Sequence, residues 1–278
     1  MNCVKDDLYL LDLLDEYGET FYKLIKQVPK GIREDYVHDL RVSARRLMAL
    51  LQLLVPKTLE NPALDSLFAL NRVLKLFGNL RDLDVQIDYT FHLLAHHPEL
   101  KDFYAALVMQ QHLAARHVER RLKAIKLDSL QKMNQKIKKR LLNLFKDPAT
   151  REQIIADLRQ DIDHALISVL IASDKIDPTD AETIHRMRLA FKKYRYSVEV
   201  IKPFLSITDQ ELQSLHAYQT MLGEIQDLEV LINSLKRYML QKKNADHKLM
   251  PVKQILEDRK SIHIQKLTRI KPDKLLTR

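Results

Sequence analysis

Apolar residues recur every three or four positions along most of the chain, the spacing typical of amphipathic helices. Strand-like alternation is hard to find, only four glycines occur, and nine prolines punctuate the helical stretches. The pattern predicts an all-α fold, a compact bundle of about ten helices. The expected spans are 5–28, 33–55, 63–77, 82–96, 99–124, 128–146, 149–173, 179–202, 208–222, 227–243 and a last one near 251–269.

One stretch of this pattern occurs twice. VHDLRVSARRLMALLQLL begins at Val37, and IHRMRLAFKKYRYSVEVI begins at Ile184. Long-range duplication predicts two similar halves, about 5–146 and 149–270, and the lack of a Gly/Ser-rich or Pro-rich linker predicts that they form a single domain over 1–278. The apolar side of each stretch should be buried: Val37, Leu40, Ala44, Leu47, Leu51 and Leu54 in the first, and Ile184, Met187, Phe191, Tyr194, Val198 and Ile201 in the second.

Each repeated stretch also carries cations opposite its apolar side. An advance of about 100° per residue puts one histidine and two cations on a narrow stripe of each helix. Like charges at i,i+4 destabilise a helix unless an anion lies between them, and arginine, lysine and protonated histidine together suit phosphate. A solvated surface carries similar charges, but their presence in both halves favours an anion-binding role. The stripes are His38, Arg41 and Arg45, and His185, Arg188 and Lys192.

A shorter echo follows each stretch, LFGNLRDLDVQI from Leu76 and MLGEIQDLEVLI from Met221. A glycine followed by acids is typical of one helix ending and the next beginning, with aspartate as N-cap. We therefore expect helix boundaries at both echoes rather than catalysis. The residues concerned are Gly78, Asp82 and Asp84, and Gly223, Asp227 and Glu229; Arg81 has Gln226 as its counterpart, so it ranks below the stripe residues.

Positive charge is concentrated in the middle of the chain. The formal net charge is +9, and residues 101–146 hold twelve Lys or Arg against three acids. This distribution permits a groove that attracts a polyanion. By helical spacing the expected stripes are His112, Arg116, Arg120 and Lys123, and Lys132, Lys136, Lys139 and Arg140.

The cysteine content, the N-terminus and the lengths of the apolar runs favour a cytoplasmic location. Cys3 is the one cysteine, which fits a reducing environment and excludes an intramolecular disulfide. The N-terminus carries acids among its apolar residues and does not read as a signal peptide, and no apolar run is long enough to span a bilayer. We expect a soluble cytoplasmic protein.

The motifs V-H-x-L-R-x-x-x-R-R-L, from Val37, and L-x-G-x-x-R-D-L-D-V, from Leu76, together resemble the CHAD family, the conserved histidine α-helical domain. The resemblance covers essentially the whole chain. It implies two helical halves related by a pseudo-twofold axis around a central basic cavity or pore that binds inorganic polyphosphate. The contact residues it implies are His38, Arg41, Arg45 and Arg46, and His185, Arg188, Lys192 and Lys193; Tyr196, one turn after Lys192, could donate a hydrogen bond, and Arg116 and Arg120 join them from the basic middle helices.

The resulting expectation is a non-catalytic polyphosphate-binding protein without cofactor or metal, associated with polyphosphate granules and with polyphosphate-metabolising enzymes as partners. Two alternatives stay open. A metal-dependent phosphohydrolase would use the His38-Asp39 pair, or His92 and His96 at i,i+4, although Arg186 replaces Asp39 in the second copy. Non-specific nucleic-acid binding is permitted by charge, although no recognition motif, glycine-rich phosphate loop or aromatic platform is visible.

Overall fold

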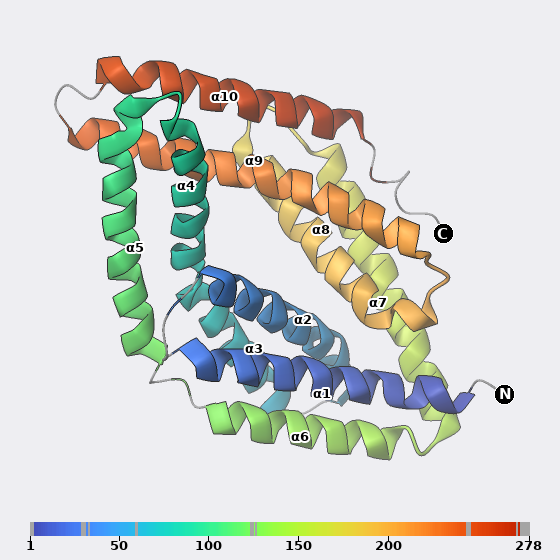
Figure 1. Ribbon diagram of the computed structural model, residues 1–278. Coiled ribbons are helices and arrows are strands. Elements are labelled where there is room, and N and C mark those ends of the chain that lie inside the picture. The colour runs from blue at the N-terminus through green and yellow to red at the C-terminus, as the bar shows by residue number, and fades with distance from the viewer. Residues whose placement is uncertain are drawn as a thin grey trace. The chain divides into compact units, whose positions relative to one another are not determined.

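The computed structural model describes residues 3–28, 32, 34–58, 61–122, 125, 127–242, 246–270 and 272. The described residues form helices and their connections without a strand, which confirms the all-α fold class (Figure 1). No helix among them is long and apolar enough to cross a membrane. The helices are α1 Cys3–Gln27, α2 Glu34–Thr58, α3 Asn61–Leu76, α4 Gly78–Leu94, α5 Lys101–Leu122, α6 Leu127–Leu144, α7 Pro148–Asp174, α8 Ala181–Ile201, α9 Asp209–Gln241 and α10 Asp246–Arg269, with short 3-10 turns η2 Pro98–Leu100 and η3 Lys202–Phe204.

The helices form two compact units, and neither unit is a continuous stretch of chain. Helices α5, α7 and α8 contribute to both, so each unit contains residues of both predicted repeats. The pseudo-twofold axis and the central cavity stay predictions, and Lys123 of the predicted basic stripe lies outside the described residues. Unit 1 comprises Met1–Gly78, Arg116–Ile167 and Lys193–Ile207, and unit 2 comprises Asn79–Ala115, Ser168–Lys192 and Thr208–Arg278.

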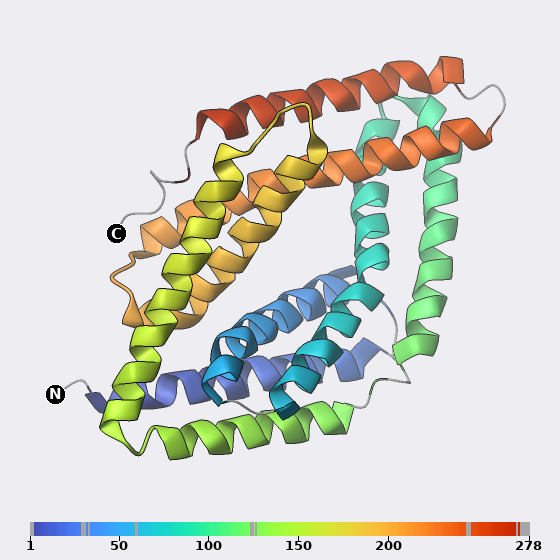
Figure 2. The ribbon, with the colours of Figure 1, turned by 180° about the vertical axis from the view of Figure 1, so that it is seen from behind.

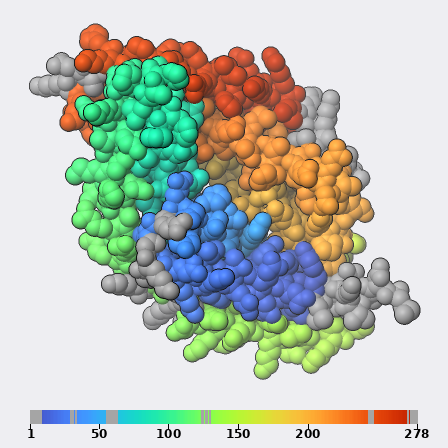
Figure 3. Space-filling model, viewed as in Figure 1, coloured from blue at the N-terminus to red at the C-terminus, as the bar shows by residue number. Residues whose placement is uncertain are grey.

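Unit 1 is built around α2. This helix packs against α1 and α3, and α6 covers both of those neighbours. Figure 2 shows α1 and α6 side by side, and the space-filling view in Figure 3 shows their side chains in contact. Every apolar residue predicted on the inner side of the two repeated stretches is buried, as the helical period requires.

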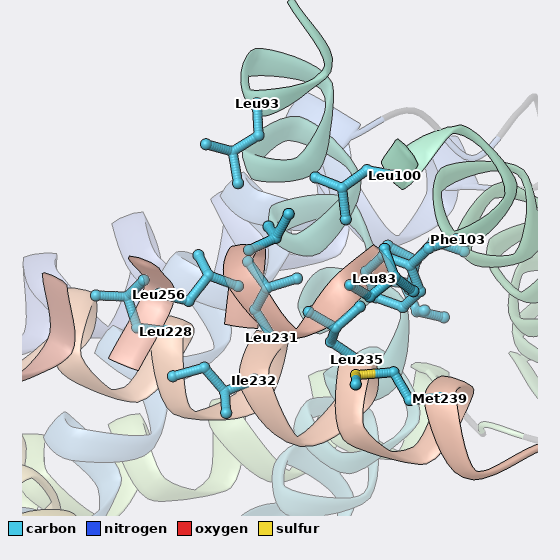
Figure 4. Packing of buried hydrophobic residues seen from close by; sticks show 13 residues of the cluster. Leu83, Leu93, Leu100, Phe103, Leu228, Leu231, Ile232, Leu235, Met239 and Leu256 are labelled. Carbon is cyan, nitrogen blue, oxygen red and sulfur yellow. The ribbon is translucent and has the colours of Figure 1, made fainter. Parts of the chain in front are cut away.

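Unit 2 is built on a long antiparallel pair, α9 and α10. Three leucines, Ile232 and Met239 of α9 form one apolar cluster with residues of α4, η2, α5 and α10 (Figure 4). The same apolar side of α9 is buried at three- or four-residue intervals from Leu215 to Met239. Salt bridges from Lys236 and Lys253 to Glu257 add polar contacts at this helix pair.

At the first echo the predicted helix boundary is present, but α4 begins four residues before the predicted start at residue 82, and at the second echo the predicted boundary is absent. Helix α9 runs unbroken through Gly223 and Asp227, and α4 already begins at Gly78, so Asp82 and Asp227 are interior helical residues rather than N-caps. A single interior glycine costs a helix only about 1 kcal/mol relative to alanine, less than the buried apolar side of α9 contributes. The N-terminus of α9 is instead fixed by a capping box between Thr208 and Glu211. Helix α10 likewise begins at Asp246, five residues before the predicted start at Pro251.

The acids of the echoes connect neighbouring helices. Asp84 on α4 is buried and accepts a 2.9 Å hydrogen bond from Gln111 on α5. At the equivalent place in the second copy, Glu229 on α9 accepts a 2.7 Å hydrogen bond from Lys260 on α10. The predicted first-turn role of these acids is therefore also wrong, because both lie inside their helices and pair across a helix interface.

Candidate anion-binding site

The second cationic stripe lies in unit 2, on the N-terminal part of α8. His185 and Arg188 line a pocket of about 180 Å³ together with Lys260 of α10 and the turn before α8. All three side chains are half-buried. Lys192, one turn further along α8, is half-buried as well but does not line this pocket. Two of the three cations predicted on this stripe thus share a concave site, with a lysine that the sequence interpretation did not select.

The imidazole of His185 is positioned by α9. Its Nδ1 lies 2.7 Å from Oε1 of Gln226, the residue that stands where the first copy has Arg81. A contact from Nδ1 to an amide oxygen requires a proton on Nδ1. Protonation of the second ring nitrogen would then turn His185 into a cation with an N–H available to an anion. Gln226 therefore orients the histidine. In the sequence it stood out only because it replaces the arginine of the Arg-Asp pair found in the first echo.

Acidic side chains temper the charge of this pocket. Glu229 lines it and is paired with Lys260. Burial alone would raise the pKa of Glu229, but hydrogen bonds from Lys260 and Asn233 and the Lys260 charge hold that pKa below its ordinary value. Glu229 thus stays ionised and keeps the lysine ammonium in place at the pocket wall.

Asp227, two residues before Glu229 on α9, interacts electrostatically with Arg188. Burial raises the pKa of the Asp227 carboxyl above its ordinary value; the Arg188 guanidinium opposes the rise, and the carboxylates of Asp82 and Glu224 add to it. The pocket cations Arg188 and Lys260 therefore each interact with a carboxylate, Asp227 and Glu229, and the net charge at the pocket depends on whether Asp227 is protonated.

The first cationic stripe lies on α2 in unit 1. His38 and Arg46 are exposed, whereas Arg41 and Arg45 are half-buried. Nη1 of Arg41 donates a 2.6 Å hydrogen bond to the backbone carbonyl of Leu74 in the last turn of α3. This arginine is thus engaged with a helix C-terminus, where the dipole favours a cation.

The other predicted contacts in unit 1 differ in exposure. Arg116, Arg120 and Lys193 are exposed, and Nε of Arg120 bonds the Arg116 carbonyl of its own helix. Tyr196 is only 6% exposed and lies under the guanidinium of Arg195, 4.3 Å from its ring centroid. A ring packed in this way belongs to the interior of unit 1, and the hydrogen bond expected from Tyr196 stays a prediction.

A larger pocket in unit 1 involves cations that the sequence interpretation missed. It is lined by Arg72 and Lys75 of α3 and by His117 and Arg121 of α5. The two α5 residues directly follow Arg116 and Arg120, which the sequence analysis had selected. The spacings within the two lining pairs, i,i+3 and i,i+4, would have revealed two further basic patches. Only the packing of α3 against α6 beside the end of α5 brings the two patches together.

Of the two histidines considered for a metal site near the end of α4, His92 has a partner on its own helix. His92 and His96 lie at and beyond the end of α4, and Nδ1 of His92 contacts the Asp88 carbonyl at 2.8 Å. Among the described residues, no group of three His, Cys, Asp or Glu side chains could hold a metal ion.

Comparison with known proteins agrees with this architecture. The chain is similar to the crystal structure of the CHAD domain from the plant Ricinus communis, with a TM-score of 0.70 and 21% identity over 94% of this chain and 89% of that one. It is also similar to PptA from Streptomyces chartreusis, with a TM-score of 0.55 and 14% identity over 94% and 95% of the two chains. No curated protein matches the sequence. Because the model of the CHAD domain matches residues 17–236, which include both cationic stripes, the chain belongs to the CHAD domain family.

Proposed function

We propose that this protein binds inorganic polyphosphate and does so without catalysis. The observation that carries the proposal is the unit 2 pocket, in which His185 and Arg188 meet Lys260. Membership of the CHAD family supports a polyphosphate-binding role, and the pocket supplies the chemistry such a role needs.

The dimensions of the pocket favour a small inorganic group. Its volume of about 180 Å³ is below the ~300–1,000 Å³ typical of sites for organic ligands. Arginine offers a fork of donors to phosphate oxygens, lysine a point charge, and protonated histidine one further donor. A phosphate unit can use all three, whereas a larger cofactor would not fit.

The cations of α2 would add weaker contacts to the same ligand class. His38, Arg45 and Arg46 would hold phosphate units through charge, and Arg41 would add its charge beside the Leu74 carbonyl. Many weak contacts along one flexible polyanion raise the overall affinity by effective concentration. Binding of this kind releases counterions, so affinity should fall steeply with salt.

The test is a calorimetric titration of the purified protein with long-chain polyphosphate at near-physiological salt, with orthophosphate and duplex DNA as competitors. R188A removes a pocket cation. R186A is its matched control, because Arg186 is an exposed arginine of the same helix whose Nε lies 3.7 Å from Oε1 of Glu182. We expect R188A to weaken binding about tenfold or more, the loss of one charge-assisted hydrogen bond, and R186A to change it less than twofold. Equal affinities of the two variants would reject the pocket, and no binding by the wild type would reject the function.

A second candidate, non-specific nucleic-acid binding, is favoured by α6. Its cations Lys132, Lys136, Lys139 and Arg140 are all exposed. Such a row can follow a nucleic-acid backbone through charge alone. Polyphosphate should displace bound duplex DNA at physiological salt. If duplex DNA instead displaces bound polyphosphate, nucleic acid is the preferred ligand.

A further inference from the structure

The larger pocket lies wholly within unit 1 and is separate from the residues of the proposed polyphosphate site. It has a volume of about 700 Å³ between α3, the C-terminal part of α5, and α6. Its four basic side chains, Arg72, Lys75, His117 and Arg121, are exposed at the rim. No hydrogen bond or ion pair engages these four side chains within the part of the chain that the structure describes. Within that part of the chain, their donors are therefore available to solvent or to a ligand.

The floor of this pocket is aliphatic. Ala69 and Leu76 of α3 lie beside Leu130 and Met133 of α6. A floor of this kind favours a ligand with a flat or branched apolar group. Inorganic polyphosphate has no apolar group that could cover it. The ligand of this pocket should thus combine an anionic group with an apolar one.

An acid completes the lining at the other end of α3. Asp65 lies seven residues before Arg72, about 10 Å along the helix axis. Both line the pocket, so the wall formed by α3 is polar at both ends, acidic at one and basic at the other, with Ala69 between them. A ligand spanning this wall needs a hydrogen-bond donor about 10 Å from its anionic group.

We propose that this pocket binds a free nucleoside di- or triphosphate. The phosphates contact Arg72, Lys75, His117 and Arg121, and the base and ribose cover the aliphatic floor. The carboxylate of Asp65 accepts a hydrogen bond from a ribose hydroxyl or an exocyclic amine. A nucleotide uses all three features of the lining, whereas a fatty acid leaves Asp65 without a donor and polyphosphate leaves the floor exposed. The volume is within the range of organic ligand sites.

Met133 offers a local reporter for the test. With methionine methyl groups labelled by carbon-13, the Met133 resonance is assigned from the M133L variant and followed by NMR during titration with ATP, adenosine or tripolyphosphate. We expect ATP to shift this resonance saturably, with a dissociation constant below about 1 mM, and adenosine or tripolyphosphate to act at least tenfold more weakly. An unmoved resonance with ATP, or equal action of tripolyphosphate, would overturn the proposal.

Variants separate this site from charge effects elsewhere. R72A/R121A removes two rim cations, and K23A/K26A removes the same charge from exposed positions of α1 that do not line the pocket. We expect the first pair to weaken ATP binding at least tenfold and the second less than twofold. The same loss in both would overturn the proposal, because net charge alone would then explain binding. Polyphosphate titrations should not distinguish the two variants, so the two proposed sites can fail independently.

Discussion

Replacement of Arg41 by alanine should destabilise unit 1 as well as weaken anion binding. The guanidinium donates to the Leu74 carbonyl at 2.6 Å and lies 3.6 Å from the position that a Cβ on Gly78 would occupy. Leu74 belongs to the last turn of α3, whose carbonyls have incomplete partners within the helix. Arg41 therefore completes the end of α3 from a neighbouring helix.

The magnitude follows from the kind of contact. A hydrogen bond to a charged group contributes about 1.5–3 kcal/mol to stability, and a cation at a helix C-terminus adds about 0.3–1 kcal/mol. Because Arg41 is only half-buried, water can replace part of the lost bond. We expect R41A to lower the free energy of unfolding by about 1.5–2 kcal/mol.

Urea unfolding followed by far-UV circular dichroism measures this change. R46A is the matched control, because Arg46 is an exposed arginine of the same helix, and it should lie within about 0.5 kcal/mol of the wild type. R41A and R46A with equal unfolding free energies would refute the structural role of the guanidinium. Polyphosphate binding by R41A must therefore be measured well below its unfolding temperature, where loss of affinity reports on contacts rather than on folding.

Two further predictions concern α9. D227N should raise polyphosphate affinity about threefold to tenfold at low salt, because it removes a negative charge beside Arg188. D227N should also raise the unfolding free energy at neutral pH, because a carboxyl with a raised folded-state pKa destabilises the fold when it is ionised. This gain in stability should vanish as the pH falls below the ordinary aspartate pKa. A gain in stability that persists in acid would contradict this cause. G223A should stabilise the protein by about 0.5–1 kcal/mol in thermal unfolding, since an added Cβ meets no atom within 4 Å inside a continuous helix; a lower melting temperature would show that α9 needs flexibility at this point.

Much of the fold could be predicted from local patterns. The apolar residues of both repeated stretches are buried because a helix with one apolar side must turn that side inward, whatever it packs against. The continuity of α9 through the second echo could not be predicted in this way. Gly223 and Asp227 are common at helix ends, but the apolar side of α9 continues past them, and its burial outweighs their local preference.

The sequence by itself determined that this chain is helical, duplicated and basic, and that each copy pairs a histidine with cations on one side of a helix. These properties depend on neighbours within a few residues, which the helical period relates directly. The tertiary structure alone decided which cations share a concave site, that Gln226 orients His185, and that Arg41 completes the end of α3. Such contacts join residues more than thirty positions apart, and only the packing of helices against one another determines them.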